Sequence, residues 1–337
     1  MGLNDIIGQE KAITILLGIL QRQRLASAYL FTGEAGIGKK TAAINFAKAV
    51  NCLNVPPSSI HGSEGPLTAG SRPSSSLVHD ACDACASCHK IDAGTHPDVI
   101  IVEPVERLIR IEEIRAIEEA LSFTPFEGKK KVVIVNDADT MNPAASNTFL
   151  KTLEEPPDDS LIILIASRPD SLLPTIRSRC SPILFHPLSL DSCRKILDGR
   201  IAAESIDEAV RLSLGRPGLA VSRDIREDRD WFIDLFKAML KAEKDSWADR
   251  QDMERWFDMV QTLMRDLAVF KITGSPEQLY NADLAENLER LGKSTGLQGI
   301  INIYNELSFV RAMLFFNLNK SLTWNYTASL LRKELVP

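Results

Sequence analysis

Apolar and polar residues follow one another in two distinct patterns along the first 190 or so residues of the chain. Five short segments are almost continuously apolar, as strands buried on both faces are: residues 27–33, 98–104, 129–139, 161–167 and 181–187. Four further segments have the composition and spacing of helices: residues 6–20, 41–50, 111–121 and 143–154. This order predicts an α/β fold in which a parallel sheet carries helices on both faces.

The pattern changes after Pro187, because only amphipathic helical segments follow. Three of them are clear, at residues 231–240, 256–270 and 297–318. We expect no buried strand beyond Pro187, so this point marks the boundary between an α/β module and an all-helical remainder. A chain of 337 residues is long enough for two or three domains with sizeable cores.

The composition is that of an ordinary globular protein, with 45% hydrophobic and 25% charged residues. The net charge of −6 argues against a protein that holds nucleic acid by bulk electrostatics alone, although partner chains could supply a basic surface. Neither a signal peptide nor an apolar run near the ~18 residues of a membrane span is present in the sequence. We therefore expect a cytoplasmic protein without membrane contact.

A segment rich in Pro, Ser and Gly at residues 55–77 predicts a flexible surface insertion. Four cysteines flank it, the last three as C-x-x-C-x-x-C: Cys52, Cys82, Cys85 and Cys88. Four thiolates satisfy tetrahedral zinc, and such a structural site would order an insertion with few apolar residues of its own. The alternatives are an iron–sulfur cluster, unliganded thiols, or replacement of one thiolate by His79 or His89. Cys180 and Cys193 lie elsewhere and are expected to be ordinary thiols.

The stretch TGEAGIGKKTA, residues 32–42, follows the first predicted strand and matches most of a phosphate-binding loop. Four of its residues are suited to surround phosphates with backbone amides and one point charge: Gly33, Gly36, Gly38 and Lys39. The next position, where a hydroxyl normally binds magnesium, is Lys40. Thr41 lies one residue late, and one residue rotates a helical side chain by about 100°, so we do not expect it to reach a metal.

The strand predicted at residues 129–139 ends in VVIVNDAD, where phosphate-loop ATPases carry Asp for magnesium and often Glu for the attacking water. The alignment places Asn136 at the metal position and Asp137 at the base position. An amide brings no negative charge to a hard cation, and Asp137 is one methylene shorter than Glu. Alternatively, Asp137 and Asp139 cap the next helix. Magnesium binding and ATP hydrolysis are therefore not expected, whereas passive binding of ATP or ADP remains open.

Two arginines in LLPTIRSRC, Arg177 and Arg179, directly precede the last predicted strand. One interpretation makes them solvated loop residues. In the other, a planar cation at an edge of the fold reaches the phosphate of a neighbouring chain. The residue types alone leave both interpretations open.

Together these segments resemble one family, the delta prime subunits of the bacterial DNA polymerase III clamp loader, within the AAA+ superfamily. The matching stretches cover roughly the first 190 residues: IIGQEKA, LFTGEAGIGKKTAA, the four clustered cysteines, HPDVIIVEP, KVVIVNDADTMNPAASNTFLKTLEEPP and LLPTIRSRC. TFLKTLEEPP followed by SRC is highly specific to clamp-loader subunits. The helical remainder matches by length and class only.

The resemblance implies three parts: a RecA-like AAA+ module at residues 1–188 with a zinc insertion at about 52–90, a helical lid at 189–228 and a collar domain at 229–337. It implies gamma/tau and delta subunits as partners in a hetero-oligomeric ring that loads the sliding clamp onto primed DNA. In this family Arg179 of the S-R-C motif is an arginine finger, which acts in trans on ATP bound to gamma/tau. Arg177 has no such role.

The chain departs from gamma/tau in the lid as well, where Gly218 replaces a sensor arginine and Arg216 lies two residues away. Lys40, Asn136 and Gly218 together predict a stator subunit of the DNA-directed DNA polymerase III holoenzyme, without ATPase activity of its own. The alternatives are an ATP-hydrolysing gamma/tau-type subunit and, from another class, a metal-dependent redox protein built on the cysteines.

Overall fold

The computed structural model describes residues 1–54, 80–222, 225–244, 247–316 and 318–335. The predicted insertion at 55–77 and His79 lie outside these residues. Contacts divide the chain into two compact units, one of Met1–Ile196 with Gly215–Gly218 and one of Leu197–Leu214 with Leu219–Pro337. None of the described helices has the length and apolar content that a bilayer span requires.

Five parallel strands form the sheet of the first unit, in the order β2-β3-β4-β1-β5. They are β1 (Ala28–Thr32), β2 (Val99–Val102), β3 (Lys131–Val135), β4 (Ser160–Ala166) and β5 (Ser181–Leu184). Every residue of β3 and β4 is buried, which is why both strands are apolar after their first residues, Lys131 and Ser160. Thr32 pairs with Ala166 and Leu184, so β1, β4 and β5 end at the same edge of the sheet.

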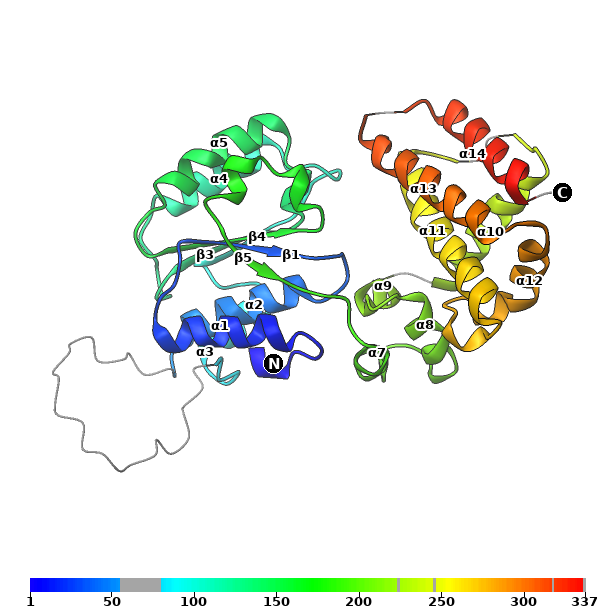
Figure 1. Cartoon of the computed structure of the whole chain (residues 1–337). Coiled ribbons are helices and arrows are strands. Elements are labelled where there is room, and N and C mark those ends of the chain that lie inside the picture. The colour runs from blue at the N-terminus through cyan, green and yellow to red at the C-terminus, as the bar shows by residue number, and fades with distance from the viewer. Residues whose placement is uncertain (55–79, 223–224, 245–246, 317, 336–337) are drawn as a thin grey trace, which may run out of the picture. The chain divides into compact units, whose positions relative to one another are not determined.

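Helices cover both faces of this sheet, with α1 and α2 on one side and α4 and α5 on the other (Figure 1). The helices of this unit are α1 (Glu10–Arg22), α2 (Lys39–Asn51), α3 (Ala86–Asp92), α4 (Ile111–Leu121), α5 (Pro143–Glu154), α6 (Pro174–Arg177) and α7 (Leu190–Leu197). Tyr29 packs edge-on against Phe46 of α2, whereas Leu30 belongs to the cluster that contains Ile117 and Phe149 of α4 and α5. The predicted α/β fold with a doubly covered parallel sheet is thus confirmed.

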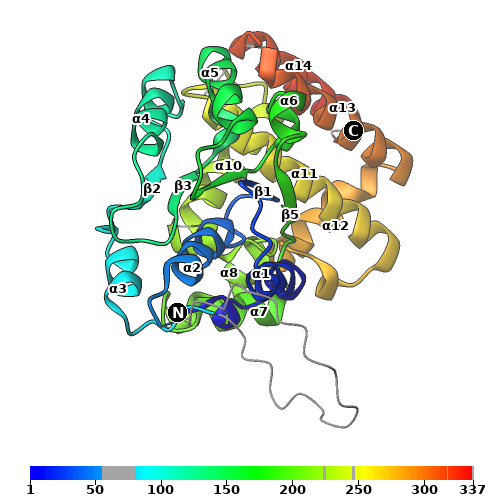
Figure 2. The same ribbon diagram turned by 90° about the vertical axis from the view of Figure 1, so that its left-hand side faces the viewer.

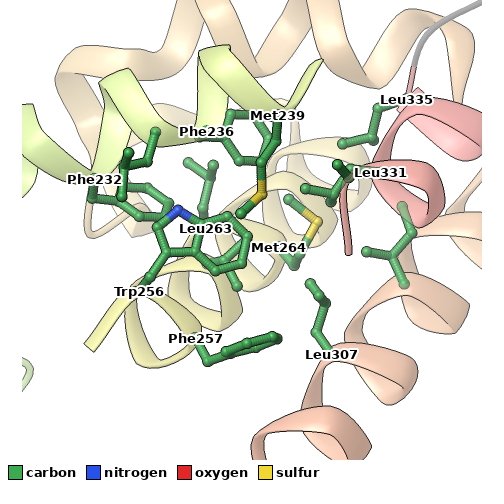
Figure 3. Close-up of a cluster of buried hydrophobic side chains, with 14 of the residues drawn as sticks. Phe232, Phe236, Met239, Trp256, Phe257, Leu263, Met264, Leu307, Leu331 and Leu335 are labelled. Carbon is green, nitrogen blue, oxygen red and sulfur yellow. The ribbon is translucent and has the colours of Figure 1, made fainter. Parts of the chain in front are cut away.

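The second unit is helical throughout its described residues, as predicted for the chain beyond Pro187. Its helices are α8 (Ile206–Leu212), α9 (Pro217–Ser222, whose first two residues belong to the first unit), α10 (Ile225–Leu240), α11 (Arg250–Thr273), α12 (Ala285–Ser294), α13 (Leu297–Met313) and α14 (Lys320–Leu335). Phe236 and Met239 of α10, Trp256 of α11 and Leu331 of α14 converge in its core (Figure 3). The contacts group the predicted lid mostly with the collar, so a separate lid at 189–228 stays a prediction.

Candidate phosphate loop, cysteine centre and arginine edge

The phosphate loop connects β1 to α2 through glycines in conformations that other residues rarely adopt. Gly33, Gly36 and Gly38 have φ of 137°, 81° and 97°. At Gly33 a Cβ would lie 2.5 Å from the carbonyl oxygen of Phe185. The backbone of the loop can therefore pass this close to the residue after β5 only if position 33 is glycine. Gly38 is the N-cap of α2, and the loop therefore leads directly into a helix N-terminus.

Lys39 turns its ammonium into the loop, where its side chain is almost fully buried. Nζ donates to the carbonyl oxygens of Gly33 and Glu34, the latter at 2.6 Å, and to Oγ of Ser167 at 3.2 Å. Burial lowers the pKa of Lys39 to about 8, although nearby carboxylates, Asp137 first among them, favour the charged form. A phosphate would thus have to replace contacts that the lysine already makes within the loop.

The free energy of unfolding of the wild-type chain is expected to rise relative to that of Lys39→Met between pH 7 and pH 9.5. The pKa of Lys39 is about 8 in the folded chain against 10.5 for the ordinary side chain, so the unfolded chain binds more protons in this window. By linkage, raising the pH then favours folding, by about 2 kcal/mol for this one group. Urea unfolding of both proteins at the two pH values measures the effect, and a pH-independent difference would contradict the buried ammonium.

A side-chain cation lies where the metal ligands of an ATPase would be. Lys40 Nζ forms an ion pair with Oε1 of Glu103 at 2.5 Å, just beyond β2. Asn136 Nδ2 donates to Oε2 of Glu103 at 2.9 Å and to Asp137 at 3.1 Å. The structure therefore links Lys40, Asn136 and Asp137 in one chain of contacts that passes through Glu103. Thr41 is exposed.

The two aspartates after β3 differ in their surroundings. Burial raises the pKa of Asp137, with the charges of Asp139 and Glu103 adding to the effect. The Asp139 carboxylate is almost fully buried and accepts from the amide of Ser167 at 3.1 Å. Asn142 caps α5 by accepting from Ala145 N, and neither aspartate makes a side-chain capping bond. Asp137 does occupy the N-cap position of the short 3-10 helix Ala138–Thr140, as the alternative interpretation places it, but the two carboxylates accept from Asn136 and Ser167 instead of making a capping bond.

Residues 215–218 lie against the phosphate loop within the first unit. The amide of Gly218 donates to the carbonyl oxygen of Gly36 at 2.9 Å, and Arg216 forms an ion pair with Glu34 at 3.3 Å. A Cβ on Gly218 would lie 2.9 Å from the same carbonyl oxygen. The position predicted for a sensor arginine thus holds a glycine whose backbone contacts the loop.

The four clustered cysteines form one group, with their sulfurs all within 4.8 Å of one another. Cys52 is the C-cap of α2, and Cys85 is the N-cap of α3, where its Sγ accepts from Cys88 N. Figure 2 shows α3 below β2 and beside α2. Four sulfurs about 2.3 Å from one zinc ion would lie ~3.8 Å apart, close to the 4.0 Å between Cys52 and Cys85. The group therefore could hold a metal, whereas His89 is exposed and lies outside it.

The thiols of this group are electrostatically unequal. Burial and the neighbouring sulfurs raise the pKa of Cys88. Burial alone would also raise the pKa of Cys85, but hydrogen bonds from the backbone amides of Cys88 and Leu53 outweigh it and lower the pKa to about 6. Backbone amides pointing at one sulfur favour the thiolate, which is the form that binds metal.

Lys48 of α2 joins the cysteine centre to the phosphate-loop helix. Its side chain is fully buried, and Nζ forms ion pairs with Asp83 and, at 2.8 Å, with Asp92. Nζ also donates to the carbonyl oxygen of Met1 at 2.9 Å. Two carboxylates and a carbonyl thus satisfy a buried ammonium that would otherwise be strongly destabilising. This contact was not predicted from the sequence, because Lys48 resembles any other residue of an alanine-rich helix.

Arg179 lies just after α6 at an accessible edge, with 35% of its side chain exposed. Its Nη2 is 2.7 Å from Oε1 of Glu154, and its Nη1 donates to the carbonyl oxygen of Thr175 at 3.0 Å. Arg177 instead forms an ion pair with Asp170, whose side chain is 92% exposed. The structure therefore holds Arg179 between two helices and leaves it within reach of another molecule.

Comparison with known proteins agrees with the resemblance that the motifs indicate. The chain matches the family described as "DNA polymerase III, delta subunit" over residues 8–64 and 70–189. It is 28% identical over 330 residues to DNA polymerase III subunit delta' of Bacillus subtilis, covering 92% of each chain. It is 30% identical over 335 residues to the subunit delta' of Pseudomonas aeruginosa, covering 94% of each chain.

DNA polymerase III subunit tau of Bacillus subtilis is 31% identical over 242 residues, which cover 67% of this chain and 39% of that one. The similarity to tau is thus partial, whereas the similarity to the delta' proteins extends over nearly the whole length of both partners. The chain therefore belongs to the delta prime family of DNA polymerase III subunits.

Proposed function

We propose that the chain is the stator subunit of a clamp loader, which does not hydrolyse ATP itself and lends Arg179 to the ATP site of a neighbouring gamma/tau subunit. The observation that supports this proposal most strongly is the contrast between two cationic sites of the chain, one in the phosphate loop and one at Arg179. The phosphate loop has Lys40 where a metal ion would be needed, while Arg179 is anchored and exposed at an edge.

The network around Lys40 argues against hydrolysis in this chain. Phosphoryl transfer depends on magnesium ions that neutralise charge on the phosphates. Here the ligand positions hold an amide, Asn136, and an ammonium, Lys40, and Glu103 is already paired with both. The proposed function does not require this chain to bind ATP or ADP. Passive binding through the backbone amides of Gly33–Lys39 would require Lys39 to give up its contacts with the loop carbonyls.

In the proposed mechanism Arg179 acts electrostatically. A guanidinium placed at the transferring phosphate lowers the energy of the charge that develops there, and such fingers are worth roughly 10³–10⁵ in rate. The proposed partners are gamma/tau and delta subunits in a hetero-oligomeric ring, which in the cytoplasm would load a sliding clamp onto primed DNA.

We further propose that the cysteine group holds structural zinc. Cys52, Cys82, Cys85 and Cys88 would bind the ion, which would cross-link the end of α2 to α3 and leave no coordination position open for chemistry. Because Zn²⁺ has no redox chemistry, a site filled with zinc would exclude the redox alternative.

Co-purification with gamma/tau and delta subunits of the same organism tests the proposed function. ATP turnover is measured before and after this chain is added. We expect a stable complex whose turnover increases on addition, with none contributed by the chain alone. A chain that fails to enter the complex, or that hydrolyses ATP by itself as a gamma/tau-type subunit would, contradicts the proposal.

A further inference from the structure

Glu154 is an acidic residue at a place where a carboxylate is electrostatically unfavourable. It is the last residue of α5, and Glu155 is the C-cap. The carbonyl end of a helix carries partial negative charge, so acidic side chains there are destabilising, and Lys151 is the basic residue in that turn. Positions that break a local rule in this way are often retained for function rather than for stability.

The contact made by Glu154 gives a physical reason for its presence. Its Oε1 lies 2.7 Å from Nη2 of Arg179, while the carbonyl oxygen of Thr175 accepts from Nη1 at 3.0 Å. Arginine side chains lose considerable rotamer freedom when they are ordered, and these two contacts from two helices order this one. Because a guanidinium has five N–H donors, donors remain for a phosphate.

The support behind Glu154 is rigid. Phe149 and Leu153 of the same helix are buried in the sheet-facing core, and Asn142 caps the helix at its other end. Arg177 provides the contrast, since it contacts Asp170 on a short 3-10 helix where the carboxylate is almost fully exposed. Of the two neighbouring arginines, Arg179 is the one whose carboxylate partner belongs to a helix that packs into the core.

We infer that Glu154 is a positioning residue for Arg179, an inference that rests on the proposed function. It keeps the guanidinium in the orientation from which it meets the phosphate of the neighbouring subunit. The carboxylate also offsets part of the positive charge of Arg179. Ordering prevails over this loss, because solvent screens the field of the half-exposed carboxylate at the more distant phosphate, whereas the direct contact between Oε1 and Nη2 still fixes the orientation of the guanidinium.

The test uses the complex assembled with gamma/tau and delta subunits. Glu154→Gln is expected to lower kcat for ATP about fivefold with KM unchanged, because the residue acts only through the finger. Glu154→Asp keeps the charge but retracts it by one methylene, so its kcat is expected to lie between those of the wild type and Glu154→Gln. Glu155→Gln is the matched control, since Glu155 has no ion-pair partner among the described residues, and it should match the wild type.

Two readouts separate positioning from a merely structural role. The melting temperature of Glu154→Gln should equal or exceed that of the wild type, since the change removes an unfavourable charge at a helix C-terminus. In an Arg179→Ala background, Glu154→Gln should cause no further loss of turnover, because both changes remove the same interaction.

The outcomes distinguish this inference from the proposed function. If Arg179→Ala slows turnover but Glu154→Gln behaves as wild type, the positioning role is wrong and the finger stands. A faster complex with Glu154→Gln would mean that the carboxylate restrains the arginine, which also overturns the inference. If Arg179→Ala itself leaves turnover unchanged, the proposed function is wrong, and the positioning role of Glu154 is wrong with it.

Discussion

Replacing Arg179 by alanine is expected to slow ATP hydrolysis about a thousandfold at the one ATP site that this subunit completes. The guanidinium is the group that the proposal places beside the transferring phosphate, and alanine leaves the developing charge unopposed. Lysine should restore only part of the rate, because a compact ammonium lacks the planar fork of arginine. Single-turnover hydrolysis by the assembled complex measures the effect.

Arg177→Ala is the matched control for this prediction. Arg177 lies two residues away and also forms an ion pair, with Asp170, so its loss removes a similar surface charge. Turnover should remain at the wild-type level, and size-exclusion chromatography should show that both variants still assemble. Equal losses in Arg177→Ala and Arg179→Ala would point to general surface charge and contradict a finger.

Removing metal from the purified chain is expected to lower its free energy of unfolding by about 5 kcal/mol. This is roughly a third to a half of the zinc contribution in isolated zinc-finger peptides, because the sheet and α2 retain their own core when the metal is lost. Loss of the ion would remove the link among the four sulfurs, so that the ion pair between Lys48 and Asp92 would remain to join α2 to α3. Denaturant unfolding before and after treatment with a chelator measures the difference.

Metal content provides the control for this second prediction. The purified chain should be colourless with about one zinc ion, and Cys85→Ser should lose it. Cys180→Ser replaces a buried cysteine outside the group and should keep the full metal content. A coloured preparation that contains iron, or a chain whose stability is indifferent to chelation, would rule out structural zinc.

Helix boundaries could be predicted from the sequence where capping residues mark them. The bounds of α4 and α5 match the predicted segments, since Glu113 in the first turn of α4 and Asn142 with Pro143 at the start of α5 signal where each helix begins. The first helix begins at Glu10 rather than at Ile6. Apolar spacing alone could not show this, because Leu3 and Ile6 belong to a separate 3-10 turn and its cap.

The candidate site was predictable where its residues are close in sequence. The loop glycines, Lys40 and the C-x-x-C-x-x-C motif are local patterns, and so is the sequence S-R-C around Arg179. Glu103, Ser167 and Glu154 were missed, because they come from the ends of other elements that only the strand order β2-β3-β4-β1-β5 and helix packing bring near. For Glu154, two acidic residues at a helix end were a usable signal.

The phosphate loop of this chain is proposed not to be a catalytic site. Steady-state ATP hydrolysis by the purified chain alone, in the presence of magnesium, is the decisive measurement. We expect turnover no higher than that of the Lys39→Ala variant measured beside it. Magnesium-dependent turnover that Lys39→Ala abolishes would show that the loop is catalytic.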